Sequence, residues 1–149
     1  MFQSMGITSS ALTAQRLRMD VISSNMANTD TTRGKIVDGE WQPYTRKMVV
    51  MQPKESSFSS VFNHVLNGAG NNKLNGVKVS NIIEDDAPYR LVYDPEHPDA
   101  DEEGYVQMPN VDPLKEMVDL MSATRSYEAN VTVFNASKSM YIKALELGK

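Results

Sequence analysis

The residues of this sequence best suited to chemistry lie in the acidic loop Asp94–Gly104. Asp99, Asp101 and Glu103 alternate along the chain and directly precede a glycine, as in the first half of a calcium-binding EF-hand loop. The twelfth position of such a loop holds a bidentate glutamate, whereas this chain has Asn110 there, and no long helix is indicated upstream. A rigid, solvated turn is therefore the favoured interpretation, and a calcium-binding module is kept as an alternative.

Other kinds of reactive site find little support in the sequence. His64 and His97 are the two histidines, they do not have the spacing of metal ligands, and the chain has no cysteine. No nucleophile elbow is present, and no glycine-rich phosphate loop follows a strand pattern. We expect a protein without enzymatic activity, without a metal and without a cofactor.

Composition narrows the possible partners of this 149-residue chain, whose formal net charge is −4. Nine acidic residues and a single basic one, Arg90, lie between positions 84 and 103, so the middle of the chain is acidic. No basic patch with interleaved aromatic residues is present, which argues against nucleic-acid binding. No apolar stretch is long enough to span a membrane, and the first residues do not have the pattern of a cleavable signal peptide.

Residues 5–27 have the pattern of a helix that is apolar over much of its circumference. Two apolar faces consist of Met5, Leu12, Met19 and Met26, and of Ile7, Ala14 and Val21. A helix packed against one core normally shows a single apolar stripe, so contacts on more than one side are expected, with a central helix of a small domain as the alternative. Asn, Thr and Asp side chains in residues 28–34 predict a turn that ends the helix.

The middle of the chain has strand-like patterns separated by Gly, Pro and Asp. The expected strands are 44–52, 77–84, 89–93 and 105–108. The turn-forming residues Asp85–Pro88 suggest that 77–93 is a hairpin, and Trp41 is expected to pack in the small core. The Ser-rich and then Asn/Gly-rich stretch 56–76 is interpreted as an insertion loop.

A second long helix is expected from Leu114 to Leu147, because Asp112 is a good N-cap, Pro113 suits the first helical position and Gly148 ends the pattern. Its length of about 50 Å exceeds what a domain of this size needs. It carries two seams near heptad spacing. The first seam contains Leu120, Ala123, Tyr127, Asn130, Phe134, Ser137, Tyr141 and Ala144. The second contains Leu114, Met117, Met121, Thr124, Glu128, Val131, Asn135, Lys138, Ile142 and Leu145.

Together these elements predict an α+β fold in which long N- and C-terminal helices pair, with a small β-rich region between them in the sequence. The expected parts are the N-terminal helix and turn (1–34), the β-rich region with its loop at 56–76 (35–109) and the long C-terminal helix (110–149). Surplus apolar surface on both helices favours assembly with other chains. The alternative is a soluble adapter whose helical hairpin binds a single partner.

Four stretches of the chain resemble the axial proteins of the bacterial flagellum, and within them the proximal rod proteins of the C type. They are residues 10–28, residues 44–47, residues 92–100 with 104–106, and residues 109–111 with 116–119 and 125–130. Many rod and hook relatives have Thr-Pro-Gly after the first helix, whereas this chain has Thr32-Arg33-Gly34, as in the proximal rod type.

The resemblance implies a structural subunit of the proximal rod, located in the periplasmic part of the basal body and exported by the flagellar type III apparatus. It implies that the terminal helices form an inner tube around the export channel and that the β-rich region forms an outer layer. The implied partners are other copies or close relatives, other proximal and distal rod proteins, and basal-body ring or adapter proteins. The expected subunit interface consists of Leu12, Leu17, Met19, Val21, Ile22, Asn25, Asn28, Met117, Met121, Tyr127, Asn130, Val131, Phe134, Tyr141, Ile142 and Leu145.

Overall fold

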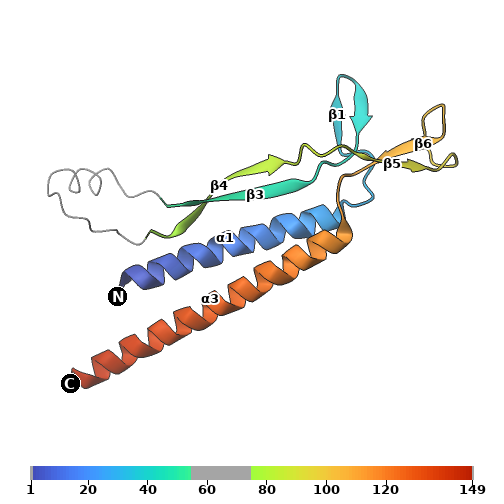
Figure 1. Cartoon of the computed structure of the whole chain (residues 1–149). Coiled ribbons are helices and arrows are strands. Elements are labelled where there is room, and N and C mark those ends of the chain that lie inside the picture. The colour runs from blue at the N-terminus through green and yellow to red at the C-terminus, as the bar shows by residue number, and fades with distance from the viewer. Residues whose placement is uncertain (1, 55–74, 149) are drawn as a thin grey trace, which may run out of the picture.

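The computed structural model describes residues 2–54 and 75–148, which form an elongated α+β structure (Figure 1). The two helices are α1 (Phe2–Ala27) and α3 (Pro113–Leu147). The strands are β1 (Lys35–Val37), β2 (Glu40–Gln42), β3 (Lys47–Pro53), β4 (Val77–Glu84), β5 (Arg90–Tyr93) and β6 (Tyr105–Met108). They form three antiparallel pairs, β1 with β2, β3 with β4, and β5 with β6. The predicted fold class is confirmed, whereas most of the predicted loop at 56–76 lies outside the described residues.

The end of α1 and the start of α3 lie where the polar residues of the sequence predicted. At the end of α1, Asn28 Nδ2 donates to the carbonyl of Ser24 (2.8 Å) and Thr29 Oγ1 donates to the carbonyl of Met26 (2.8 Å). These side chains add hydrogen bonds to carbonyl groups of the last helical turn, which also accept the backbone N–H groups of Asn28 and Thr29. At the start of α3, the Asp112 carboxylate accepts the backbone N–H of Leu114 (3.0 Å), so the predicted N-cap is confirmed.

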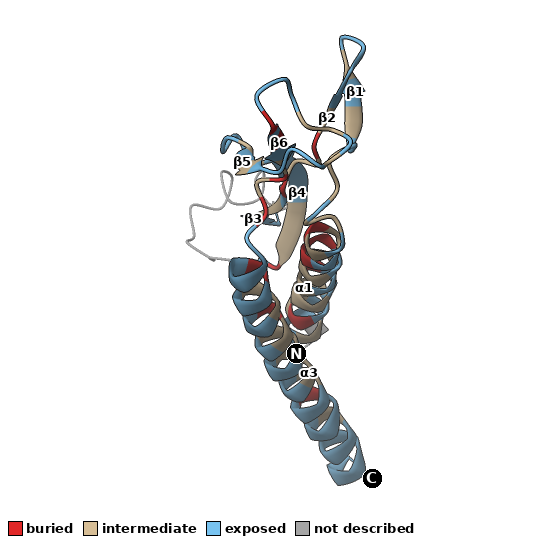
Figure 2. Cartoon of the chain, turned by 90° about the vertical axis from the view of Figure 1, so that its right-hand side faces the viewer, coloured by how far each residue is buried: buried red, intermediate tan, exposed pale blue. Residues whose placement is uncertain are grey.

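The two helices pack along each other, and the C-terminal end of α3 extends past the start of α1 (Figures 1 and 2). Ala123 and Ser137, both from the first seam, are buried. Most residues of the second seam are exposed, including Met117, Met121 and Ile142. The first seam of α3 is therefore used within the chain, and the second is left open.

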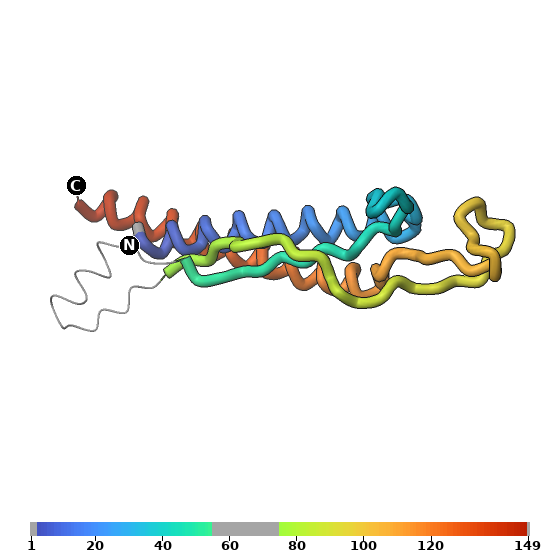
Figure 3. The backbone as a smooth tube through the Cα atoms, turned by 90° about the horizontal axis from the view of Figure 1, so that it is seen from above, coloured from blue at the N-terminus to red at the C-terminus, as the bar shows by residue number. Residues whose placement is uncertain are grey.

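The β3–β4 ribbon lies along α1 (Figures 1 and 3), and both of its strands contact the helix. α1 is thus covered by α3 and also by a ribbon of its own chain, which accounts for part of its wide apolar arc. The polar stripe opposite, which includes Ser9, Thr13 and Arg16, is exposed. In the described part of the chain the buried apolar core is correspondingly small and consists of Ala14, Val21, Ile22, Val106, Val111 and Ala123.

The predicted hairpin over residues 77–93 is wrong. β4 pairs with β3, from Lys47 opposite Glu84 to Pro53 opposite Val77, and β5 pairs with β6. The segment between β4 and β5 does not close a hairpin because Asn110 Nδ2 binds its carbonyl groups at Asp85 (3.2 Å) and Ala87 (3.0 Å). The chain therefore passes from one ribbon to the next at this point.

The β1–β2 hairpin was not predicted, and the expected burial of Trp41 is wrong. Trp41 lies opposite Ile36 on this ribbon, and its side chain is 56% exposed because no other layer among residues 2–54 and 75–148 covers that face. Positive φ angles at Asp38 (53°) and Gly39 (91°) match a type I′ turn. An Asp-Gly pair between apolar residues is a strong hairpin signal, so the sequence did contain the evidence for this element.

Among the described residues, neither helix combines the length and the apolar character required to cross a bilayer.

Candidate functional site: a polar junction between helices and strands

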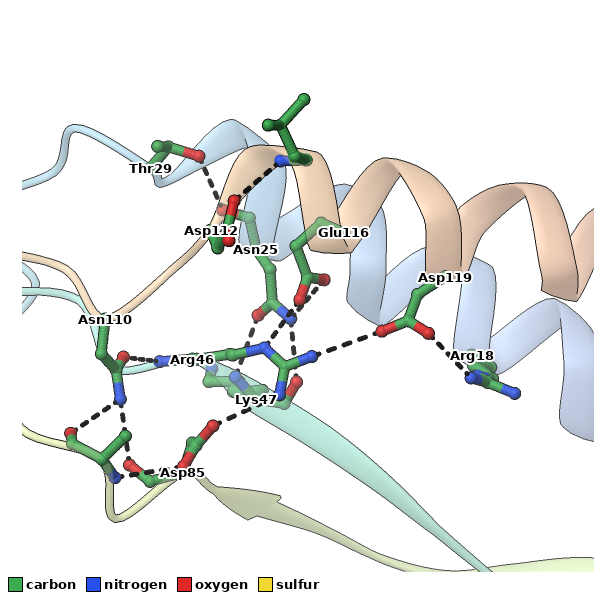
Figure 4. Close-up of polar contacts among 12 residues, drawn as sticks. Arg18, Asn25, Thr29, Arg46, Lys47, Asp85, Asn110, Asp112, Glu116 and Asp119 are labelled. Carbon is green, nitrogen blue, oxygen red and sulfur yellow. Dashed lines mark hydrogen bonds and ion pairs between the residues drawn. The ribbon is translucent and has the colours of Figure 1, made fainter.

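Arg46, which directly precedes β3, is the centre of a buried cluster of charged side chains (Figure 4). Its Nε lies 2.6 Å from Glu116 Oε1, its Nη1 lies 3.3 Å from Asp85 Oδ2, and its Nη2 lies 3.5 Å from Asp119 Oδ2. Glu116 and Asp119 come from the first turns of α3, and Asp85 directly follows β4. One guanidinium group thus connects α3 to both strands of the β3–β4 ribbon.

Asn25 brings α1 into the same cluster, and its side chain is almost fully buried. Its Nδ2 donates to Glu116 Oε2 (3.0 Å) and to the backbone carbonyl of Lys47 (2.9 Å). Its Oδ1 accepts the Lys47 N–H (2.9 Å) and the Tyr44 hydroxyl (3.0 Å). The amide therefore makes the four hydrogen bonds available to it and pairs with Lys47 as a neighbouring strand would.

Asn110 completes the cluster from the segment between β6 and α3. Its Oδ1 accepts the backbone N–H of Arg46 (2.8 Å), and its Nδ2 binds the two carbonyl groups in the link between β4 and β5. We call this cluster the polar junction, and it consists of Asn25, Arg46, Asp85, Asn110, Glu116 and Asp119. Since its members come from α1, α3, the residue before β3 and the segments that follow β4 and β6, the junction sets the position of the helices relative to the ribbons.

The electrostatics of the polar junction favour the charged forms of Arg46 and Asp85. The pKa of Asp85 is lowered, first because its carboxylate accepts the backbone N–H of Ala87 and also because Arg46 binds it. Burial by itself would lower the pKa of Arg46, but its contacts with Glu116 and Asp85 outweigh this effect and raise it. Glu116 is fully buried with a hydrogen bond on each oxygen, so neither of its polar atoms is left without a partner in the interior.

The acidic loop is joined to the turn after α1 by Asp99. Its carboxylate accepts hydrogen bonds from Thr32 Oγ1 (2.7 Å) and Arg33 Nε (2.8 Å), and these two contacts, Arg33 first, lower its pKa. Asp101 Oδ1 accepts the backbone N–H groups of Glu103 and Tyr105. Two carboxylates of the EF-hand-like pattern are thus used in contacts within the chain: Asp99 binds the turn after α1, and Asp101 binds the backbone of its own loop. Within residues 2–54 and 75–148, no three His, Asp or Glu side chains are grouped so as to bind a metal ion.

The residues expected at a subunit interface fall into three groups. Three are buried within the chain itself: Val21, Ile22 and Asn25. Nine are half-buried: Leu12, Leu17, Met19, Asn28, Tyr127, Asn130, Val131, Phe134 and Tyr141. Four are exposed: Met117, Met121, Ile142 and Leu145. The exposed group, all on the second seam of α3, is the part most available to another chain.

Most of the polar junction was absent from the expected site residues, although Glu116 carries a recognisable signal. It lies four residues before Leu120 and seven before Ala123, which places a carboxylate on the seam that faces α1. A charge on a buried seam requires a partner from another element. Arg46, Asn110 and Asp119 belong to stretches that carry the family resemblance, but their contacts with one another depend on the fold.

Comparisons with known proteins find matches at both ends of the chain and along its whole length. Residues 5–34 match the family described as "Flagella basal body rod protein", and residues 102–147 match the family described as "Flagellar basal body rod FlgEFG protein C-terminal". The chain is similar to proteins named flagellar basal-body rod protein FlgC. The Bacillus subtilis protein is 66% identical, covering 99% of this chain and 98% of its own. The Borreliella burgdorferi protein is 44% identical (99% and 97%), and that of Salmonella typhimurium is 47% identical (96% and 94%).

Proposed function

Because this chain belongs to the family of flagellar basal-body rod proteins, we propose that its paired helices form part of an inner tube that lines the export channel and transmits torque. Proteins of this family are structural, so the chain is a subunit of the flagellar rod and not an enzyme. Its assembly with other rod components follows from the same relationship. The questions that concern this chain are which surface assembles and how force passes through the subunit.

The exposed second seam of α3 is the observation that carries the proposed assembly. Leu114 and Leu145, near the two ends of the helix, are 75% and 74% exposed, and Met117 and Met121 are about half exposed. Apolar side chains along one face of a long helix lose free energy when another surface covers them. Neighbouring subunits would supply that surface, with the polar middle of the seam at Glu128 fixing the register of the contact.

The polar junction gives the proposed force path a physical basis. Charge-assisted hydrogen bonds between Arg46 and carboxylates from α3 (2.6 Å) and the end of β4 (3.3 Å) are directional, in contrast to apolar contacts that can slide. A load applied to the helices would reach the β-rich part through these contacts as well as through the chain connections. The subunit would then rotate as one body.

The same family relationship supports a more specific location for the subunit within the flagellum. It would lie in the proximal rod, in the periplasmic part of the basal body, after export by the flagellar type III apparatus. Its neighbours would be other copies or close relatives, proximal and distal rod proteins, and ring or adapter proteins of the basal body. Family membership supports these placements.

Electron microscopy of basal bodies provides the test. A strain lacking its own copy of this protein would be complemented with the wild-type chain, with Met117→Asp/Met121→Asp, or with Ser139→Asp as a control at an exposed polar position of the same helix. We expect truncated rods and loss of motility for the double variant and normal rods for the control. Normal rods with the double variant would refute the role of the second seam, and a wild-type chain bound singly outside the helical lattice would favour an adapter.

A further inference from the structure

The β5–β6 ribbon has a partly buried inner face and an exposed outer face, and on the outer face three large apolar or aromatic side chains lie beside Gln107. On the inner face Val106 is only 2% exposed and Val92 is half-buried. On the outer face Leu91 is 63%, Tyr93 65% and Tyr105 41% exposed. These three side chains, which we call the β5–β6 patch, project from the same side because residues two apart and residues directly opposite share a face of a ribbon.

Two tyrosines of the β5–β6 patch pack against each other within the chain. Tyr93 and Tyr105 are opposite each other in the ladder, and their rings pack edge to face with centroids 5.3 Å apart. Aromatic rings held in this way present a large apolar area and lose little conformational freedom on binding. Exposed aromatic side chains of this kind are frequent centres of protein–protein interfaces.

A rim of negative charge borders the β5–β6 patch. The acidic loop leaves the ribbon after Tyr93 and returns to it before Tyr105, and the side chains of Glu96, Glu102 and Glu103 are exposed. No basic side chain pairs with these three glutamates in the part of the chain that the structure describes. Their charge is therefore available to a partner, in contrast to that of Asp99, which Arg33 binds.

The β5–β6 patch lies far from the C-terminal end of the α3 surface assigned to helix packing (Figure 1). The β5–β6 ribbon is at the end of the molecule opposite both chain termini (Figures 1 and 3). A protein bound there would be distinct from one that packs along the C-terminal half of α3. A protein bound at the β5–β6 patch would thus make a contact separate from the one along the C-terminal half of α3.

We propose that the β5–β6 patch binds a protein surface that presents lysine or arginine side chains around an apolar centre. The tyrosines would enter the apolar centre, and Glu96, Glu102 and Glu103 would face the basic residues at the rim. The acidic rim would repel phosphate groups, which disfavours nucleic acid and anionic lipid as partners. The inference rests on the proposed function in one respect: the partner is a protein that the chain meets once it is in the rod.

Photo-crosslinking in isolated basal bodies tests this proposal. Tyr93→p-benzoylphenylalanine places a reactive aromatic group in the β5–β6 patch, and mass spectrometry identifies the segment to which it crosslinks. We expect a segment with lysine or arginine near the crosslinked residue. Adding Glu102→Lys/Glu103→Lys should reduce the crosslink yield by roughly fivefold or more at low salt, because attraction at the rim becomes repulsion.

A control with the same change of charge is Glu40→Lys/Asp86→Lys, at two exposed carboxylates of the β-rich part outside the rim. It should leave the crosslink yield within about twofold of the parent, as expected for charges remote from a contact. A crosslinked segment that is acidic or uncharged, an unchanged yield after reversal at the rim, or no crosslink at all in assembled rods would overturn the proposal. Immunoblots of the same basal bodies report whether the chain is incorporated, so a failure of the proposed rod function is recognised separately.

Discussion

Replacing Glu116 with glutamine is the most direct test of the polar junction. Glu116→Gln keeps the shape of the side chain and removes its charge. In the native chain one carboxylate oxygen accepts from Arg46 Nε at 2.6 Å and the other accepts from Asn25 Nδ2 at 3.0 Å. A glutamine has a single acceptor oxygen, so either Arg46 or Asn25 must then face the amide N–H₂ group, a donor against a donor.

The loss in free energy of unfolding caused by Glu116→Gln depends on the contacts that Arg46 keeps. Removing one partner of a buried ion pair costs about 3–5 kcal/mol when the other charge is left alone. Here Arg46 would keep Asp85 and Asp119, although at the longer distances of 3.3 and 3.5 Å. The expected loss is therefore that of one hydrogen bond to a charged group plus an unsatisfied donor, about 2–3 kcal/mol. For a chain of this length the midpoint of thermal unfolding would fall by about 5–10 °C.

Urea unfolding of the purified chain, followed by far-ultraviolet circular dichroism, measures this loss. Glu84→Gln is the matched control, because Glu84 pairs with Lys35 at 2.8 Å on the surface, with the two side chains 50% and 41% exposed. Solvent screens that pair, so the control should lose less than about 1 kcal/mol. If Glu116→Gln lost no more than the control, the Glu116 carboxyl would be acting as a neutral group and the description of the junction as an ionic network would be wrong.

Three further predictions concern acid stability, a tight turn and the helix pair. The pKa of Asp85 is lowered in the folded chain, so its contribution to stability is present above its unfolded pKa of about 3.9 and is lost as the pH falls through the folded value. In Asp85→Asn the free energy of unfolding should therefore depend less steeply on pH below about pH 4. Gly34→Ala would place its Cβ 2.7 Å from the backbone of Tyr44 and should cost about 1–3 kcal/mol in urea unfolding, whereas Gly6→Ala, with nothing within 4 Å, should gain about 0.5–1 kcal/mol. Phe134→Asp should abolish swimming in soft agar because it places a charge in the helix pair, and normal motility would contradict that assignment.

The sequence contained enough information for the helices and most strands. Capping residues are local signals, so Asp112 and Pro113 located the start of α3, and the polar residues after Ala27 located the end of α1. The expected ranges of β4 and β6 agree with the structure for a similar reason, since alternation and turn residues act within a few positions. The Asp38-Gly39 turn shows that local evidence was also present for the β1–β2 hairpin.

Strand pairing was less predictable, because it depends on residues distant in the chain. The turn residues between β4 and β5 favour a hairpin when considered alone. The pairing of β4 with β3 and the capture of the intervening carbonyls by Asn110 outweigh that local preference. Trp41 illustrates the same limit, since its apolar character predicts burial only where another layer is available to cover it.

The sequence by itself determined the class of the protein, its two helices and the stretches that relate it to flagellar rod proteins, because periodicity, capping and motifs are properties of neighbouring residues. Only the tertiary structure decided that Asn25, Arg46, Asp85, Asn110 and Glu116 meet in one junction. Partners in such a contact are as many as 91 positions apart, as between Asn25 and Glu116. No local rule pairs them, because a buried charge requires a partner without specifying where in the chain it lies.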